Sequence, residues 1–325
     1  MKLSSESYPI SNSTIQSFLR CRRKWWLGYY RGLTPRVEKA VGPLAIGTRV
    51  HIALSAYYST EHRDAIAAYD ETVRQDKERC PELVADIEKE SALGRVMLEG
   101  YFAWIAETGI DQGLTVISDE ERIEVASGYP GVLLIGKLDV RVRREEDNAR
   151  LFIDHKTVGS LLVPTLPMDP QMLMYHLLEF LKLLSDTGAQ ADLETSLPLA
   201  HERCDGGLYN MLKKSKRTTR ATPPFYDRIH VQHNIHELRS FWVRLHGTIR
   251  DILEVKDALD AGADHHFVAY PSPRNTCSWD CPFFAICGLA DDGSHFEGAI
   301  ELSYRVADPY RYYDESVVES DVSDD

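Results

Sequence analysis

The feature that most constrains the fold is an alternating apolar segment at residues 132–142, which lies between two other strand-like segments. Its apolar side chains are Val132, Leu134, Leu138, Val140 and Val142. They share one face of an extended chain, because alternate residues of a strand point the same way. Residues 114–125 and 150–156 also have strand character. Short polar turns separate the three segments, so we expect an antiparallel meander.

Helical patterns precede and follow these strands. Ser11 begins a helix-capping sequence, and Pro43 is suited to the first turn of a second helix. Residues 64–107 have a helical composition, and a long amphipathic helix is expected from Asp169-Pro170 to about Leu184. The sequence therefore predicts a mixed α/β fold with a central, mostly antiparallel sheet, flanking helices and a helical insertion before the sheet.

Charge and hydropathy exclude some classes of protein. The 325 residues include 50 acidic and 37 basic residues, giving a net charge of −13. This balance argues against a protein that coats nucleic acid through bulk charge, although local binding remains compatible with it. The sequence has no apolar run of 18 residues and no signal-peptide core near its start. We therefore expect no membrane span and a cytoplasmic location, where the six cysteines favour a metal or cluster over disulfides.

Two carboxylates and a lysine form the main chemical signal. Asp154 and Lys156 lie two apart on one strand and so project from the same face. Asp139 lies on the preceding strand, on the face opposite the apolar stripe. Carboxylates bind Mg²⁺ or Mn²⁺, and a cation bound next to a phosphodiester offsets charge and activates water. A lysine beside the cation can orient that water and stabilise developing charge. Glu124 on the first strand is a further acid that could support the site, although a solvated position is more typical of such a residue.

An isolated Asp-x-Lys sequence is more typical of a solvated ion pair on a strand. Three further features coincide with it here. His51 follows Gly47 in a Gly-x-x-x-His sequence on a predicted helix, and Gly136 precedes Asp139 by three residues. Gln171 and Tyr175 lie four apart, hence on one face of a helix.

This ordered set resembles the RecB-like branch of the PD-(D/E)XK nucleases. The opening sequence around Phe18, Cys21 and Lys24 is also similar to that branch, and the likeness runs from about residue 13 to 288. The resemblance implies a PD-(D/E)XK core and a metal-dependent deoxyribonuclease. It implies as metal ligands His51, Asp139, Asp154 and the carbonyl of His155. It gives Lys156 the role of orienting water, and Gln171 and Tyr175 that of steadying the site or contacting DNA.

The cysteines favour a cluster without excluding other interpretations. Cys277, Cys281 and Cys287 are spaced by four and six residues, which fits a zinc ribbon poorly. Three clustered thiolates and a distant one can hold an iron–sulfur cluster, and Cys21 is the natural fourth ligand. The layout resembles the AddB nuclease domain and CRISPR-associated RecB-like exonucleases, which implies a [4Fe–4S] cluster. Those relatives often have a Cys-x-x-Cys pair, whereas three residues intervene here, so zinc and free thiols remain alternatives.

Two basic segments are candidates for nucleic-acid binding. The first contains Arg20, Arg22 and Arg23 beside Trp25, Trp26, Tyr29 and Tyr30. Bases and aromatic rings together suit single-stranded nucleic acid, although the rings can equally be core. The second is a predicted loop that contains Lys213, Lys214, Lys216, Arg217 and Arg220.

We divide the sequence into five functional segments. They are an N-terminal helix with the first cluster cysteine (1–45), a helical segment with the motif histidine (46–112), the nuclease core (113–270), the cysteine region (271–290) and an acidic, predicted disordered tail (308–325).

The sequence favours an exonuclease that acts on DNA ends or single strands, in DNA processing or recombination. The compact form resembles nucleases of bacteriophages and CRISPR loci, which would place a phage-encoded protein in the host cytoplasm. Without a Walker A sequence, unwinding would require a helicase or recombination protein as partner. The competing hypotheses are a catalytically silent DNA-binding or adaptor subunit with this fold and a zinc-stabilised scaffold.

Overall fold

The structure is a computed structural model that describes residues 7–37, 40–61, 63–186 and 203–313. The chain divides into two compact units, each assembled from segments that are distant in the sequence. Unit 1 comprises Met1–Glu38, Glu124–Gly136 and Arg239–Asp325, and unit 2 comprises Lys39–Ile123 and Lys137–Leu238. The five segments expected from the sequence are functional divisions along the chain, whereas these units group the segments that pack together.

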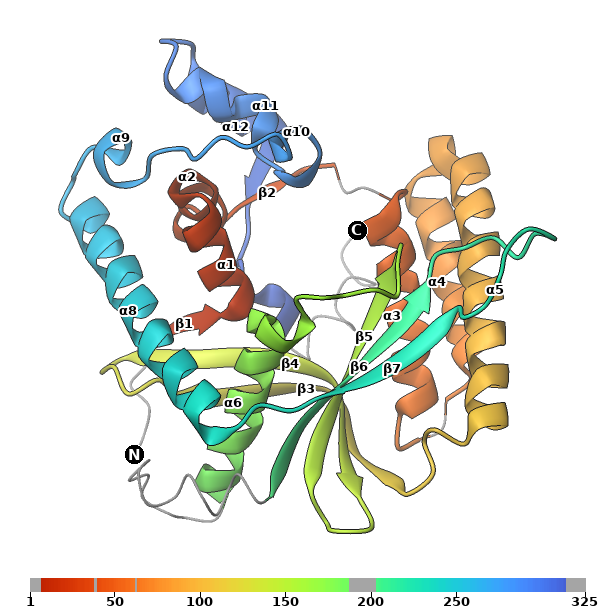
Figure 1. Ribbon diagram of the computed structural model, residues 1–325. Coiled ribbons are helices and arrows are strands. Elements are labelled where there is room, and N and C mark those ends of the chain that lie inside the picture. Colours follow the sequence, from red (N-terminus) through yellow and green to blue (C-terminus); the bar gives the residue numbers. More distant parts are fainter. Residues whose placement is uncertain (1–6, 38–39, 62, 187–202, 314–325) are drawn as a thin grey trace. The chain divides into compact units, whose positions relative to one another are not determined.

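The sheet in unit 2 is mixed (Figure 1). Its strands follow the order β4 (Val132–Arg144), β5 (Arg150–Val158), β6 (Cys204–Lys213) and β7 (Tyr226–Val231), and β3 (Leu114–Ala126) pairs with β4. The β4–β5 and β6–β7 pairs are antiparallel, whereas β5 and β6 are parallel. The mixed α/β class is confirmed, but the sheet is less antiparallel than expected. The reason is that the connection from β5 to β6 contains a helix, α6 (Pro170–Asp186), which allows a parallel crossover.

Helices cover both faces of this sheet. On one face, α3 (Pro43–Tyr58) and α5 (Val84–Thr108) share a core with alternate strand residues such as Val140 and Ile153. The helix between them, α4 (Ala65–Arg79), packs against both, and the three lie side by side in Figure 1. The expected helical insertion between His51 and the sheet corresponds to α4 and α5, whereas α3 is the helix that carries His51. Short 3₁₀ turns complete the unit at η2 (Pro81–Leu83) and η3 (Leu166–Met168).

A buried ion pair attaches α6 to the opposite face. The guanidinium of Arg141 on β4 donates to both oxygens of Glu179 on α6, over 2.7 and 2.8 Å. The two side chains are only 5% and 2% exposed. Such a paired geometry fixes both position and orientation, because a guanidinium and a carboxylate match over two hydrogen bonds. It therefore helps to set where the middle of α6 lies along the sheet.

Unit 1 begins with a strand and a capped helix. Strand β1 (Tyr8–Ser11) pairs in parallel with the first part of β4, from Tyr8 opposite Val132 to Ser11 opposite Ile135. The predicted cap at Ser11 is confirmed, since its side chain accepts the Thr14 N–H and begins α1 (Asn12–Arg20). The remaining elements are α2 (Arg22–Trp25), η1 (Trp26–Tyr30), β2 (Leu33–Pro35), α8 (Ile235–Asp260, which starts in unit 2), α9 (His265–Val268), α10 (Cys277–Asp280), α11 (Phe284–Cys287), η4 (Gly288–Ala290), α12 (Phe296–Ser303), β8 (Tyr304–Val306) and η5 (Arg311–Tyr313).

The structure changes the interpretation of two sequence features. Trp25 and Trp26 are 0% and 6% exposed, so they are core residues and do not offer stacking surfaces. Of the expected acidic tail, residues 308–313 are described, and Tyr310 is buried and accepts a hydrogen bond from Thr14. The rest of that prediction, residues 314–325, lies outside the described residues. Within the described ranges, no helix is long and apolar enough to cross a bilayer.

Candidate active site

Strands β4 and β5 bring the predicted acids and lysine together in unit 2. The antiparallel register that pairs Val140 with Ile153 leads into Asp139 and Asp154 at adjoining positions. The Lys156 ammonium lies 2.9 and 2.8 Å from the two carboxylate oxygens of Asp154. The Asp139 Oδ2 atom accepts the backbone N–H of His155 over 2.7 Å. Two carboxylates and one ammonium therefore converge at a single place on the sheet.

Helix α3 adds His51 to this group. The His51 Nδ1 atom lies 3.5 Å from Asp139 Oδ2. Gly47, one turn earlier, faces β5, and a Cβ at this position would lie 3.3 Å from Thr157 Oγ1. Glycine therefore permits the close approach of helix and strand that places His51 at the acids. This gives the Gly-x-x-x-His spacing a physical reason.

The two carboxyl groups have opposite electrostatic character. Burial raises the pKa of Asp154 to about 6, with Lys156 opposing and Asp139 reinforcing the shift. Burial also acts to raise the pKa of Asp139, but the hydrogen bond and charge of His51 outweigh it, so this pKa lies well below its ordinary range. Conversely, Asp139 outweighs the effect of burial on His51 and raises the pKa of the imidazole.

Asp154 is under-satisfied for a buried carboxylate. Only 1% of the residue is exposed, and its Oδ2 atom accepts no well-oriented hydrogen bond from the described residues. A buried charge without full hydrogen bonding destabilises a fold unless another charge compensates it, and here the Lys156 ammonium, 2.8 Å from Oδ2, supplies one positive charge beside two carboxylates. Oxygen donors from Asp139, Asp154 and the His155 carbonyl, with the His51 ring, are a set that a divalent cation can use. The residues present therefore fit such a cation.

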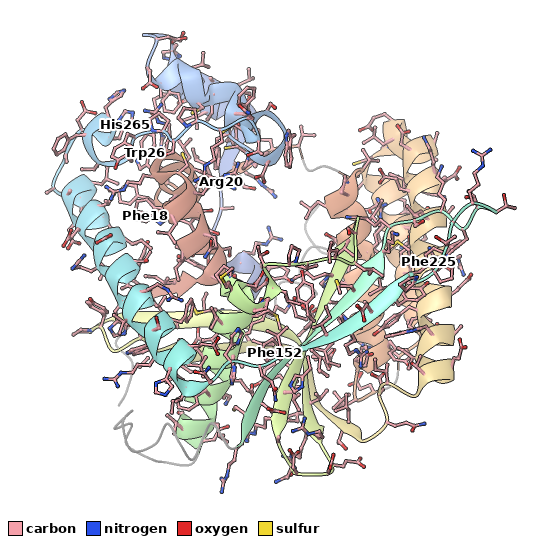
Figure 2. The ribbon with its side chains drawn as sticks, in the orientation of Figure 1. Phe18, Arg20, Trp26, Phe152, Phe225 and His265 are labelled. Carbon is pink, nitrogen blue, oxygen red and sulfur yellow. The ribbon has the colours of Figure 1, made fainter. Side chains whose placement is uncertain are left out.

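Helix α6 contributes the predicted amide and hydroxyl. The Gln171 side-chain amide donates to the Tyr175 hydroxyl over 2.9 Å. The Tyr175 ring packs edge-on against Phe152, with centroids 5.7 Å apart; Phe152 is labelled in Figure 2. Phe152 precedes Asp154 by two residues on β5, so both project from one face. Gln171 and Tyr175 therefore lie on the side of the sheet from which Asp154 projects.

A buried polar network behind His155 was not predicted from the sequence. The Asn210 side-chain amide on β6 lies 2.9 Å from His155 Nδ1, and its carbonyl accepts from Arg228 Nε on β7 over 3.0 Å. Arg228 also donates to Asp111 and to the hydroxyls of two tyrosines, Tyr58 and Tyr101. Burial lowers the pKa of His155 to about 3, so this ring is neutral. The sequence feature that could have indicated this network is Asn210, a polar residue between apolar residues of a strand.

A further acid near the site was also not predicted. Glu124 on β3, for which the sequence favoured a solvated position over a supporting role, is exposed. Glu120 on the same strand instead lies 2.9 Å from the ammonium of Lys137 on β4. Lys137 precedes Asp139 by two residues and therefore shares its face of the strand.

The four predicted cluster cysteines line one cavity in unit 1. Cys21, Cys277, Cys281 and Cys287 surround a volume of about 190 Å³, together with Arg20, Arg23 and Lys24. Backbone N–H groups of Ser272 and Arg274 donate to the sulfurs of Cys21 and Cys277, respectively. Burial raises the pKa of the Cys281 and Cys287 thiols.

The first basic segment has internal partners. Arg20 forms an ion pair with Asp280, and Arg23 binds both oxygens of Asp291 over 2.6 and 2.9 Å. Arg22 lies over the rings of Phe18 and Tyr270. These contacts hold unit 1 together, so the first segment offers fewer available charges than its sequence suggests.

The second basic segment starts at the edge of the sheet near Lys156. Lys213 lies opposite Val158, two residues beyond Lys156. The Lys214 N–H donates to the Val158 carbonyl over 2.7 Å, which ties the start of the loop to the end of β5.

The rest of this loop combines one packed arginine with exposed bases. Arg217 stacks over Phe225, which is labelled in Figure 2, and donates to the Tyr226 hydroxyl over 2.7 Å. Lys216 and Arg220 are exposed. These two side chains are therefore accessible to a ligand, whereas Arg217 holds the loop against β7.

A mixed sheet in which neighbouring strands present two carboxylates and a lysine is an arrangement suited to enzymes that cleave phosphodiesters with a metal ion. Comparison with protein families assigns the chain to one of them. Residues 9–288 match the PD-(D/E)XK nuclease superfamily, so the chain belongs to that superfamily and is a nuclease. A search of curated proteins finds no match.

Proposed function

We propose that the chain is a deoxyribonuclease of the RecB-like branch that uses Mg²⁺ or Mn²⁺ and acts as an exonuclease on DNA ends or single strands. The convergence of Asp139, Asp154 and Lys156 carries the proposal, because two buried carboxylates lie at adjoining positions of neighbouring strands beside one ammonium. The branch and the exonuclease activity rest on the order of the sequence motifs.

The residues around the centre have distinct roles in this mechanism. Asp139, Asp154, His51 and the His155 carbonyl would hold the cation, which when bound lowers the pKa of water and offsets phosphate charge. The His155 N–H and His51 keep Asp139 ionised and oriented. Lys156, held beside Asp154, orients the attacking water. Gln171 and Tyr175 offer an amide and a hydroxyl to a phosphate oxygen.

The second basic segment supports DNA binding at this centre. Strands β5 and β6 are parallel, so the loop after β6 leaves the sheet at the edge where β5 ends beyond Lys156. Lys216 and Arg220 are exposed on that loop. Cations near the end of the catalytic strand suit a DNA backbone that enters the site from this edge.

The cysteine cavity supports a [4Fe–4S] cluster in unit 1. Cys21, Cys277, Cys281 and Cys287 line a single cavity, so four thiolates from two distant segments of the sequence are available to one group. Lys24 lines the same cavity and can offset negative charge there, whereas Arg20 and Arg23 are paired with Asp280 and Asp291.

The proposed activity is tested with end-labelled single-stranded and duplex DNA in Mg²⁺, Mn²⁺ or chelator. We expect metal-dependent shortening from the ends by the wild-type protein, and no cleavage by Lys156→Ala despite retained DNA binding. Near-wild-type cleavage by Lys156→Ala would show that the assigned site is wrong. DNA binding by the wild type without cleavage in either metal would favour the silent adaptor subunit.

A loop variant separates DNA binding from chemistry in the same experiment. For single-stranded DNA, the logarithm of the binding constant falls with the logarithm of the salt concentration, with a slope of about −0.7 for each phosphate that the protein neutralises. Replacing Lys216 and Arg220 by alanine should therefore make this slope shallower by about 0.7 for each phosphate contact that is lost. Lys89→Ala removes an exposed lysine of α5 and serves as the control. An unchanged salt slope in the loop variant would remove the loop from the DNA path.

A further inference from the structure

Glu120 is placed beside the candidate active site by an ion pair with the strand that carries Asp139. Its carboxylate lies 2.9 Å from the Lys137 ammonium, and the two side chains are 25% and 9% exposed, respectively. Lys137 and Asp139 lie two apart on β4, about 7 Å along the strand and on the same face. The ion pair therefore brings a further carboxylate to the face from which Asp139 projects.

The acids on either side of Glu120 have other partners. Asp119 accepts hydrogen bonds from Ser55 and Arg63, and Glu121 accepts from Ser118 and Arg141. The described partner of Glu120 is Lys137, although its environment also includes the charges of Asp139 and His51. Burial and the charge of Asp139 together raise the pKa of Glu120, while Lys137 and His51 oppose them.

A structural ion pair alone does not require this location. Placing Glu120 beside Asp139 adds repulsion between two carboxylates, which a divalent cation would convert into attraction. The Lys137 ammonium supplies one positive charge at Glu120, whereas a cation would supply two.

We propose that Glu120 is a further carboxylate ligand of the divalent-cation centre and that Lys137 is the counter-ion that holds it when no cation is bound. The inference rests on the proposed function.

The test measures Mn²⁺ binding to the full chain without DNA, by calorimetry and by the electron paramagnetic resonance signal of free Mn²⁺. Loss of a residue that supports a metal site typically weakens binding by roughly 10- to 100-fold. We expect a loss of that size in Glu120→Gln, partial recovery in Glu120→Asp and no change in the control Glu124→Gln. Lys137→Met should bind Mn²⁺ more tightly than the wild type, because the competing ammonium is gone.

The directions in which Glu120→Gln and Lys137→Met change the Mn²⁺ affinity distinguish the proposal from a structural ion pair. A structural pair would make Glu120→Gln and Lys137→Met weaken Mn²⁺ binding together, through loss of local order. That result, or Glu120→Gln binding within about twofold of wild type, would overturn the role of Glu120 while leaving the proposed nuclease centre intact. A wild-type chain that binds no Mn²⁺ would overturn both. Melting temperatures measured in chelator confirm that each variant is folded before it is compared.

Discussion

At the scale of single residues, Asp154 shows how a proposed catalytic position conflicts with stability. The carboxylate is almost fully buried, and its pKa is raised to about 6. A carboxyl group whose pKa is higher in the folded than in the unfolded state destabilises the fold when it is ionised. Stability therefore rises as the pH falls through the folded pKa toward the unfolded one. Near neutral pH the metal-free protein carries this destabilising charge, and a bound cation would compensate it.

We therefore predict that Asp154→Asn removes cleavage without lowering stability in chelator. The amide keeps the shape of the side chain and removes the buried charge, so the variant should melt at the same temperature as the wild type or higher. Added Mn²⁺ should raise the melting temperature of the wild type more than that of the variant. Scanning calorimetry with and without Mn²⁺ measures both effects.

Asp147→Asn is the matched control, because Asp147 is exposed and its pKa is lowered by its hydrogen bond with Arg144. It should keep cleavage and its response to Mn²⁺. A melting temperature of Asp154→Asn several degrees below wild type in chelator would contradict the assigned electrostatics.

At the scale of elements, the central strands are joined through one buried arginine. Arg228 on β7 binds Asn210 on β6, and Asn210 in turn contacts His155 on β5. The same guanidinium reaches Tyr58 at the end of α3 and Tyr101 on α5. Its side chain is 2% exposed. The network therefore connects three strands and two helices behind the strand that carries Asp154 and Lys156.

Arg228→Met should destabilise the fold by about 3–5 kcal/mol, because it removes one partner of a buried charged network and leaves the others unsatisfied. Urea unfolding measures the change. Arg74→Met is the control: Arg74 pairs with Glu71 and Glu78 on the exposed surface of α4, so little change is expected. Equal losses in the two variants would show that the network around Arg228 does not contribute as proposed.

At the scale of the whole molecule, unit 1 joins segments from opposite parts of the sequence. Cys21 at the end of α1 lines the same cavity as Cys277, Cys281 and Cys287. A group bound by all four would link these segments, and its binding free energy would contribute to folding. The link would close a long loop of chain. Closing a loop lowers the conformational entropy of the unfolded chain, and this effect grows with the length of the loop.

Cys21→Ala should lower the iron content, reduce absorption near 400 nm and lower the melting temperature of anaerobically purified protein. Cys80→Ala is the control, since Cys80 lies in unit 2 at the end of α4 and does not line the cavity. Cleavage by Cys21→Ala should fall only as far as folding is impaired. Full iron content and unchanged melting would exclude Cys21 as a ligand and reopen the zinc and free-thiol alternatives.

Local patterns were sufficient to predict the elements that depend on neighbouring residues. The cap at Ser11, the helix that begins at Pro43 and the alternating strands around Asp139 and Asp154 follow from side-chain periodicity and capping chemistry. Those patterns also indicated that Asp154 and Lys156 share a face, since the period of a strand is two residues.

Tertiary structure alone decided which distant residues meet. It made β5 and β6 parallel, buried Trp25 and Trp26, and paired Arg23 with Asp291. It also brought Arg228 to Asn210 and Glu120 to Lys137. None of these contacts has a local period in the sequence, because each depends on packing between segments that only the folded chain brings together. The shared strand face of the candidate site residues could therefore be predicted along the chain, whereas the charges and hydrogen bonds around them depend on the fold.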